Sequence, residues 1–260
     1  MCLLVLAWRA HPRYRLIVAA NRDEYHDRPA QALGPWPHPD DLLAGRDLRA
    51  GGTWLGMDRQ RRFGVITNYR DRQAAAAAAP SRGGLIPRYL RGAAGAGEYF
   101  SAIEGEAESY GGFNLLLADA QSLWYGSNRV QPFARPLEPG IYGLSNERLD
   151  TPWPKLQRVR SRFEAWLRPD GDVDPAGLFP MLEDPEPAIG TEGSSGAEPA
   201  SSWEQALSAP FVRHPEFGTR SATVLLLETS GDLMMRERRF DRDGRPAGES
   251  EFSLRRGEWL

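Results

Sequence analysis

Cysteine is almost absent from this chain, which has one, Cys2, among 260 residues. A single thiol excludes an intramolecular disulfide framework and any metal site built from several thiolates. The four histidines (His11, His26, His38 and His214) are scattered without metal-ligand spacing, so we expect no zinc site and no other cofactor. Packing or reactivity therefore remains as the role of Cys2.

Lysine is equally scarce, because Lys155 is the only one in the sequence. Chemistry that uses a lysine nucleophile or a Schiff base has this single candidate. Its Thr-Pro-Trp-Pro-Lys segment predicts no apolar pocket that would lower the pKa of the amine. We therefore do not expect lysine chemistry.

Long apolar runs and a strong net charge are also missing. No run approaches the roughly 18 residues that cross a bilayer, and the opening Cys2 to Trp8 stretch lacks the basic region of a signal peptide. The net charge of −3 creates no field that would gather nucleic acid or an anionic membrane. We expect a cytoplasmic chain with no transmembrane segment and no nucleic-acid partner.

Length and composition indicate one globular domain, residues 1–260, with 41% apolar and 26% charged residues. Residues 184–202 are rich in Pro, Glu, Gly and Ser and predict a mobile loop within it. The Ala74 to Ala79 tract predicts either a short helical piece or a slack insertion, and we assign it no function.

Apolar runs separated by turn residues predict a series of strand hairpins. The first pairs Cys2 to Trp8 with Leu16 to Ala20, and both runs lack polar alternation, so each strand should be buried on both faces. Further hairpins are predicted at 52–57 with 63–68, at 113–119 with 123–127, and at 222–228 with 233–240, and further strands end near Asn146 and in the 248–260 tail. Helices are predicted at 83–108, 154–167 and 175–182, and a long surface loop at 28–50. This order favours the α+β class, as an αββα sandwich of two stacked antiparallel sheets between helical layers.

Methionine aminopeptidase removes Met1 when the second residue is small, as Cys2 is. Cys2 would then carry both a thiol and a free α-amino group. Its thiolate would be the nucleophile and its own α-amino group the base, with ordinary pKa values of about 8.5 and about 7.7 to 8.0. The amine then needs an acceptor that orients it toward the sulfur. The end of the second strand of a tight hairpin lies beside the start of the first, so Asp23 or Asn21 can reach Cys2.

Each of these residues also has a simpler interpretation. A lone cysteine in an apolar strand is more often an inert packing residue, and Arg22 with Asp23 or Glu24 is by default a surface ion pair. Asn68 and Asn146, each just after an apolar strand, are by default turn residues rather than oxyanion donors.

Seven ordered motifs resemble the NRDE-domain family, also called the Transport and Golgi organization protein 2 family. They are Met1-Cys2, Ala19 to Glu24 with Arg28-Pro29, Gly51 to Gly56, Thr67 to Tyr69, Gly112 to Leu115, Tyr142 to Asn146 with Thr151 to Trp153, and Gly218 to Arg220. The family is similar in turn, more weakly, to choloylglycine hydrolases and penicillin acylases, which use an N-terminal cysteine in an αββα fold to cleave amide bonds. The resemblance therefore implies the N-terminal-nucleophile hydrolase fold.

The resemblance also implies roles for individual residues. Cys2 matches the nucleophile, Asp23 the acidic partner of its amine, Asn146 and Asn68 the oxyanion or substrate contacts, and Arg220 a late-strand arginine. The other motif residues expected to contact substrate are Asn21, Arg22, Glu24, Trp54 and Asn114. One departure is that those hydrolases carry an arginine just before their Asn-x-Asp triplet, where this chain has Ala20.

Two functions follow as hypotheses. The first is a cysteine amidohydrolase or acyl-transfer enzyme acting on an amide or acyl bond of a small-molecule or lipid-derived substrate. The second is a non-catalytic binding or trafficking protein for acyl-coenzyme A, lipid or haem, in which Arg22 and nearby arginines neutralise phosphates or propionates. The resemblance links the second to Golgi organisation and secretion.

Overall fold

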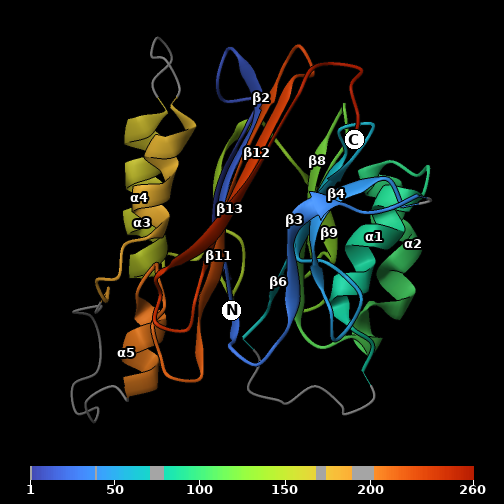
Figure 1. Cartoon of the computed structure of the whole chain (residues 1–260). Helices are drawn as coiled ribbons and strands as arrows, with labels where there is room; N and C mark the ends of the chain where they lie inside the picture. Colours follow the sequence, from blue (N-terminus) through green and yellow to red (C-terminus); the bar gives the residue numbers. More distant parts are fainter. Residues whose placement is uncertain (1, 39, 71–78, 168–173, 189–201) are drawn as a thin grey trace.

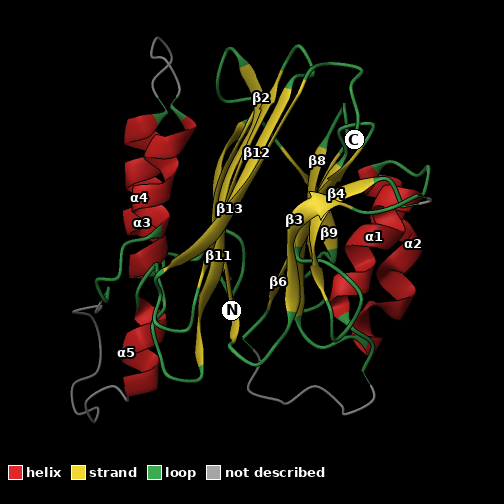
Figure 2. Cartoon of the chain, in the orientation of Figure 1, coloured by secondary structure: helices red, strands yellow, loops and turns green. Residues whose placement is uncertain are grey.

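Two antiparallel sheets lie face to face at the centre of the molecule, and helices cover both outer faces (Figures 1 and 2). The computed structural model describes residues 2–38, 40–70, 79–167, 174–188 and 202–260. The αββα sandwich expected from the sequence is confirmed.

The first sheet has six strands in the order β10-β1-β2-β11-β12-β13. β1 and β2 form the predicted N-terminal hairpin within it. The strands are β10 (Gly140–Leu144), β1 (Cys2–Trp8), β2 (Tyr14–Tyr25), β11 (Phe217–Glu228), β12 (Leu233–Phe240) and β13 (Pro246–Leu254).

The second sheet has seven strands, β3 to β9 in chain order, so every neighbour in it is also the next strand along the chain. They are β3 (Ala30–Pro35), β4 (Leu42–Asp47), β5 (Leu55–Asp58), β6 (Phe63–Asn68), β7 (Phe113–Ala118), β8 (Leu123–Ser127) and β9 (Ala134–Leu137).

The helices divide between the two outer faces, as Figure 1 shows. The second sheet is covered by η1 (Arg82–Gly84), α1 (Leu85–Arg91), α2 (Ala96–Ile103) and η2 (Glu104–Ser109). The first sheet is covered by α3 (Pro154–Trp166), η3 (Pro175–Leu178), α4 (Phe179–Leu182) and α5 (Ser202–Ser208). In α3, Pro154 begins the helix, and Leu156, Val159 and Phe163 form the buried face at helical spacing.

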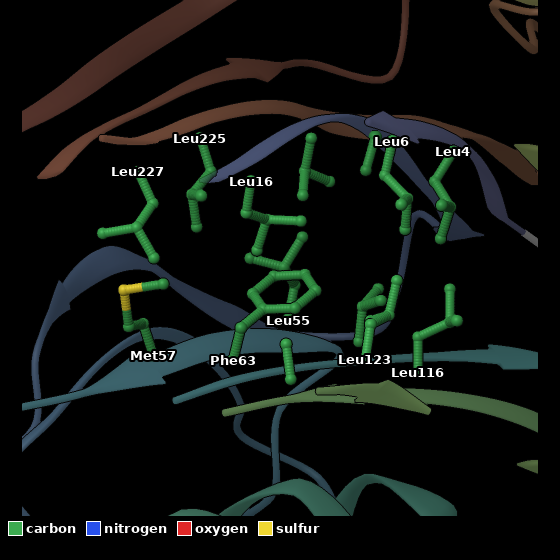
Figure 3. Close-up of a cluster of buried hydrophobic side chains, with 14 of the residues drawn as sticks. Leu4, Leu6, Leu16, Leu55, Met57, Phe63, Leu116, Leu123, Leu225 and Leu227 are labelled. Carbon is green, nitrogen blue, oxygen red and sulfur yellow. The ribbon is translucent and has the colours of Figure 1, made fainter. Parts of the chain in front are cut away.

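β1 is buried on both faces, as its unbroken apolar run predicts. Leu4 and Leu6 point into the core between the sheets, whereas Leu3 and Val5 pack under the helices of the first sheet. Figure 3 shows the core between the sheets, where side chains such as Leu16 meet Phe63 and its neighbours from the opposite sheet. Strand alternation thus assigns the side chains of this hairpin to one core or the other.

The expected surface loop at 28–50 is wrong, because this segment contains the strands β3 and β4. Its richness in Pro, Asp and Arg suggested a loop, but β3 is an edge strand, a position that tolerates proline. Its Leu33 backbone N–H donates to the buried Glu237 carboxylate across the sandwich at 2.9 Å. The second strand also does not end at Ala20, since β2 continues to Tyr25.

Two other expectations concern segments that the structure describes only in part. Of the loop predicted at 184–202, residues 189–201 lie outside the described residues, as do residues 74–78 of the alanine tract. Among the described residues, no helix combines the length and apolarity that crossing a membrane requires.

The core between the sheets predicts the cost of losing one leucine. Replacing Leu16, which is 0% exposed, with alanine should lower the free energy of unfolding by about 2–5 kcal/mol, because the substitution removes buried contacts and leaves a cavity. Urea unfolding of Leu16→Ala and of wild type measures this. The matched control is Leu48→Ala, at a side chain that is 52% exposed, which should change stability by less than about 0.5 kcal/mol. Equal losses in the two variants would contradict this account of the core.

Candidate functional site

Cys2 begins β1 at one end of the sandwich. Antiparallel pairing sets it directly opposite Arg22 of β2, and Ser145 Oγ donates a hydrogen bond to the Cys2 carbonyl at 3.2 Å. The side chain is half-buried and lines a cavity of about 490 Å³. The only thiol of the chain therefore faces a space that a ligand can enter.

Six of the residues singled out in the sequence line this cavity together. They come from β1, β2, the β4–β5 connection and the end of β6, which are distant in the chain, and they are Cys2, Arg22, Asp23, Glu24, Trp54 and Asn68. Arg22, Asp23 and Glu24 of β2 thus lie around the same cavity as Cys2, whereas Asn21 does not line it.

Asp23 is a buried carboxylate beside the start of β1. Its side chain is 2% exposed, and Oδ1 accepts a hydrogen bond from Thr219 Oγ1 at 2.7 Å. Burial raises the pKa of Asp23, while the charge of Lys155 and the hydrogen bond from Thr219 act against this rise. Thr219 therefore belongs to the site, although within the Gly-Thr-Arg motif only the arginine was expected to do so.

The guanidinium of Arg22 is held between an aromatic ring and two carboxylates. Its Cζ lies 4.2 Å from the centre of the Trp54 ring. Nη2 lies 3.4 Å from Asp47 Oδ2 and 4.0 Å from Glu24 Oε2. Asp47 also binds Arg28 Nε at 2.6 Å. Burial tends to raise the pKa of Asp47, but hydrogen bonds from Arg28 and from backbone N–H groups outweigh it and lower the pKa.

Burial raises the pKa of the Cys2 thiol, and the charge of Asp23 raises it further. A hydrogen bond from the backbone N–H of Asp23 and the charge of Arg22 oppose this, but the pKa stays above its ordinary value. The thiol is consequently protonated at neutral pH, and a base must remove its proton before it can act as a nucleophile.

The two asparagines expected to act as oxyanion donors occupy different positions. Asn68 ends β6 with an exposed side chain that lines the cavity. Asn146 is 4% exposed, and its Nδ2 donates to the Asn68 carbonyl at 2.8 Å. Asn146 thus lies behind Asn68 and supports its backbone, outside the cavity lining.

Three further candidates point elsewhere. Asn21 Nδ2 donates to the carbonyls of Leu182 and Pro210 at 2.8 and 3.0 Å, in the helical layer. Asn114 is 0% exposed and accepts from the Tyr125 hydroxyl at 2.8 Å. Arg220 Nη1 donates to the His26 carbonyl at 2.8 Å. Asn21, Asn114 and Arg220 do not line the main cavity, and their contacts tie surrounding elements together.

The sequence also left two basic residues of this region unassigned. Lys155 is 7% exposed and donates to the Leu207 carbonyl at 2.8 Å, so the expectation that it lacks an apolar pocket is wrong. Burial lowers the pKa of its amine, and the charges of Asp23 and Cys2 oppose the shift. That Lys155 is the only lysine of the sequence was the one feature that could have marked it as a residue of the site. Arg82 lines the cavity but belongs to no motif, so nothing in the sequence marked it.

Comparison with known proteins agrees with this architecture. A protein-family model described as Transport and Golgi organisation 2 matches residues 1–242. The chain is 34% identical over 259 residues to the human Transport and Golgi organization protein 2 homolog, covering 92% of each chain. It is 24% identical over 262 residues to the Drosophila melanogaster Transport and Golgi organization protein 2, covering 90% of each.

A solved structure shows the same fold at low sequence identity. The Caenorhabditis elegans ortholog of N-acylethanolamine-hydrolyzing acid amidase matches with a TM-score of 0.50 and 9% identity, over 86% of this chain and 92% of that one. That likeness concerns the fold alone, an N-terminal-nucleophile hydrolase sandwich. The family match over residues 1–242 and the 34% identity to the human homolog show that this chain belongs to the Transport and Golgi organisation 2 family.

Proposed function

We propose that this chain is a cysteine amidohydrolase or acyl-transfer enzyme whose nucleophile is Cys2. The observation that carries the proposal is that the only thiol opens into a cavity of about 490 Å³ whose lining also holds a carboxylate, a guanidinium and an amide. The amide class follows by analogy with the C. elegans fold relative, which is named for hydrolysing N-acylethanolamines. A shared fold does not carry a reaction, so the residues of the site have to support the chemistry.

The raised pKa of the Cys2 thiol creates the need for a base. Once Met1 is removed, the α-amino group of Cys2 is within the same residue as the sulfur and has an ordinary pKa of about 7.7 to 8.0, so it can accept the thiol proton near neutral pH. Asp23, buried beside the start of β1, is the carboxylate that would orient this amine.

The reaction then proceeds through a thioester. Cys2 Sγ attacks the substrate carbonyl carbon, a C–S bond forms, and the carbonyl oxygen becomes an oxyanion. The Asn68 amide, which lines the cavity, donates to that oxygen. The C–N bond breaks as the protonated amine of Cys2 gives its proton to the departing nitrogen. Water, or an acceptor amine in acyl transfer, then attacks the thioester and restores the thiol.

Arg22 and Asn146 act on this site indirectly. The related hydrolases carry an arginine at the position of Ala20, which this chain lacks. Arg22 lies opposite Cys2 instead, and its charge lowers the pKa of the thiol. Asn146 holds the Asn68 backbone through its 2.8 Å hydrogen bond. Both are positioning residues in this mechanism.

Non-catalytic binding of acyl-coenzyme A, lipid or haem is the second candidate. It is favoured by the arginines in the cavity lining, which suit phosphates or propionates. A carrier needs no nucleophile, so on this hypothesis Cys2→Ala should bind palmitoyl-coenzyme A or haem as tightly as wild type, measured by fluorescence titration. The absence of saturable binding at micromolar ligand would contradict it.

The enzyme hypothesis predicts that a free Cys2 amine is required for turnover. We would express the chain behind a cleavable tag whose removal leaves Cys2 as the first residue, and assay it with p-nitrophenyl esters of short and long acids. The cleaved protein should show a burst and turnover, and the uncleaved protein should not, because its Cys2 nitrogen is an amide. Cys2→Ala, cleaved in the same way, should lose turnover by on the order of a thousandfold or more while folding normally. Equal rates in the cleaved, uncleaved and alanine proteins would rule the mechanism out.

The raised thiol pKa makes a separate prediction about alkylation. The rate at which iodoacetamide modifies Cys2 should increase with pH through a midpoint above that of the same chain unfolded in urea, because burial disfavours the thiolate. Cys2 is the only cysteine, so intact mass measures this rate directly. A folded-state midpoint equal to or below the unfolded one would show that the thiol is not desolvated.

A further inference from the structure

We propose that Arg82 is the anion-recognition residue of the cavity, and that the molecule bound beside Cys2 carries a carboxylate or phosphate group. Arg82 and Cys2 line the same cavity of about 490 Å³. That this anion is the substrate rests on the proposed function, whereas the anion site itself rests only on the cavity.

Arg82 brings a guanidinium that no ion pair holds into the described lining. It is the first residue of η1, and its half-buried guanidinium donates from Nη1 to the Gly112 carbonyl at 2.8 Å. No carboxylate within the described ranges forms an ion pair with it. A guanidinium has five N–H donors and keeps its charge in proteins, so Arg82 has donors to offer a ligand.

The other arginines of the cavity are already paired with acids. Arg22 and Arg28 share Asp47, at 3.4 and 2.6 Å. Both also lie near Glu24, at 4.0 and 3.8 Å. Arg49 lies 3.3 Å from Asp27. Among the arginines of the described lining, Arg82 is therefore the one whose guanidinium forms no ion pair with a carboxylate.

The electrostatics of Arg82 agree with a ligand site. Burial lowers the pKa of its guanidinium, and negative charge on Glu24 or Cys2 raises it again. A desolvated cation gains most from an anionic partner that replaces the water it has lost.

The backbone around Arg82 is held firmly. The Thr53 backbone N–H donates to the Gly83 carbonyl at 3.0 Å, and a Cβ added at Gly52 would overlap the Gly83 backbone. The glycine of the Gly-Gly-Thr-Trp motif thus allows η1 to approach the β4–β5 connection. An arginine on such a fixed turn loses less entropy on binding an anion.

The test compares two alkylating reagents of nearly equal size that differ in charge, the anion iodoacetate and the neutral iodoacetamide. In both reactions the Cys2 thiolate displaces iodide, so an S–C bond forms and a C–I bond breaks. Because both reagents attack the same thiolate, the ratio of their rates cancels changes in thiol pKa or exposure. Intact mass gives each rate, since no other cysteine exists.

In Arg82→Gln the ratio of the iodoacetate rate to the iodoacetamide rate should fall about fivefold at low ionic strength. Added salt should reduce this difference between the variant and wild type. Arg82→Lys should keep most of the wild-type ratio because it keeps the charge. The matched control is Arg91→Gln, since Arg91 pairs with Asp40 at 2.7 Å and does not line the cavity. Its ratio should equal that of wild type. An unchanged ratio in folded Arg82→Gln would overturn the proposal.

A second measurement identifies the anion without relying on the glutamine variant alone. Inorganic phosphate and malonate are each tested for protection of wild-type Cys2 against iodoacetamide, and then with Arg82→Lys and Arg82→Gln. Protection by phosphate alone assigns a phosphate ligand, and protection by malonate alone assigns a carboxylate. Saturable protection that is lost in Arg82→Gln is the expected result. Failure of both anions to protect up to tens of millimolar contradicts an anion site.

These outcomes separate the two proposals. Alkylation requires no turnover. If Arg82→Gln leaves the iodoacetate-to-iodoacetamide ratio unchanged, the role of Arg82 is rejected and the nucleophile hypothesis stays intact. The absence of a burst with the p-nitrophenyl esters would reject the enzyme hypothesis and leave the anion site unaffected.

Discussion

The antiparallel register of β1 against β2 decides where the chemistry of this protein lies. Cys2 pairs with Arg22, and the same register continues through apolar pairs from Leu4 with Ala20 to Trp8 with Leu16. A slip of one residue would turn every side chain of β1 to the opposite face and carry the thiol from the cavity side into the helical layer. Because both faces of β1 are buried, such a slip would also misplace the leucines of two cores. The packing of the sandwich therefore positions the site.

Polar contacts complete this end of the sandwich. Asp23 Oδ1 accepts from Thr219, and Lys155 donates to the Leu207 carbonyl. Arg22 contacts Asp47 and Trp54. Buried charges are tolerated only with partners of this kind, since an unpaired one costs several kcal/mol, about 3–5 when a partner is removed. The same network keeps the cavity polar. It surrounds a thiol whose pKa is raised by burial with the groups that proton transfer would use.

The fold was largely predictable where strands are buried on both faces, because unbroken apolar runs such as Cys2 to Trp8 are distinctive. It was not predictable at β3, an edge strand that contains Gly34 and Pro35, or at β4, an inner strand that carries Arg46 and Asp47. At the site, six of the residues that were given a site role line the cavity, whereas Asn21, Asn114 and Arg220 do not, and their side chains bind surrounding elements. A motif records that a residue matters in its family and does not distinguish ligand contact from support.

The sequence by itself determined the layered architecture, the family and the placement of the thiol at the first residue of a buried strand, because these depend on local alternation and on motifs along the chain. Only the tertiary structure decided what each charged side chain contacts. Arg22 meets Asp47, Lys155 meets the Leu207 carbonyl, and Arg82 lies in the cavity of Cys2, all through contacts between segments far apart in sequence. Electrostatic energy depends on distance and burial in space, and neither can be read along the chain.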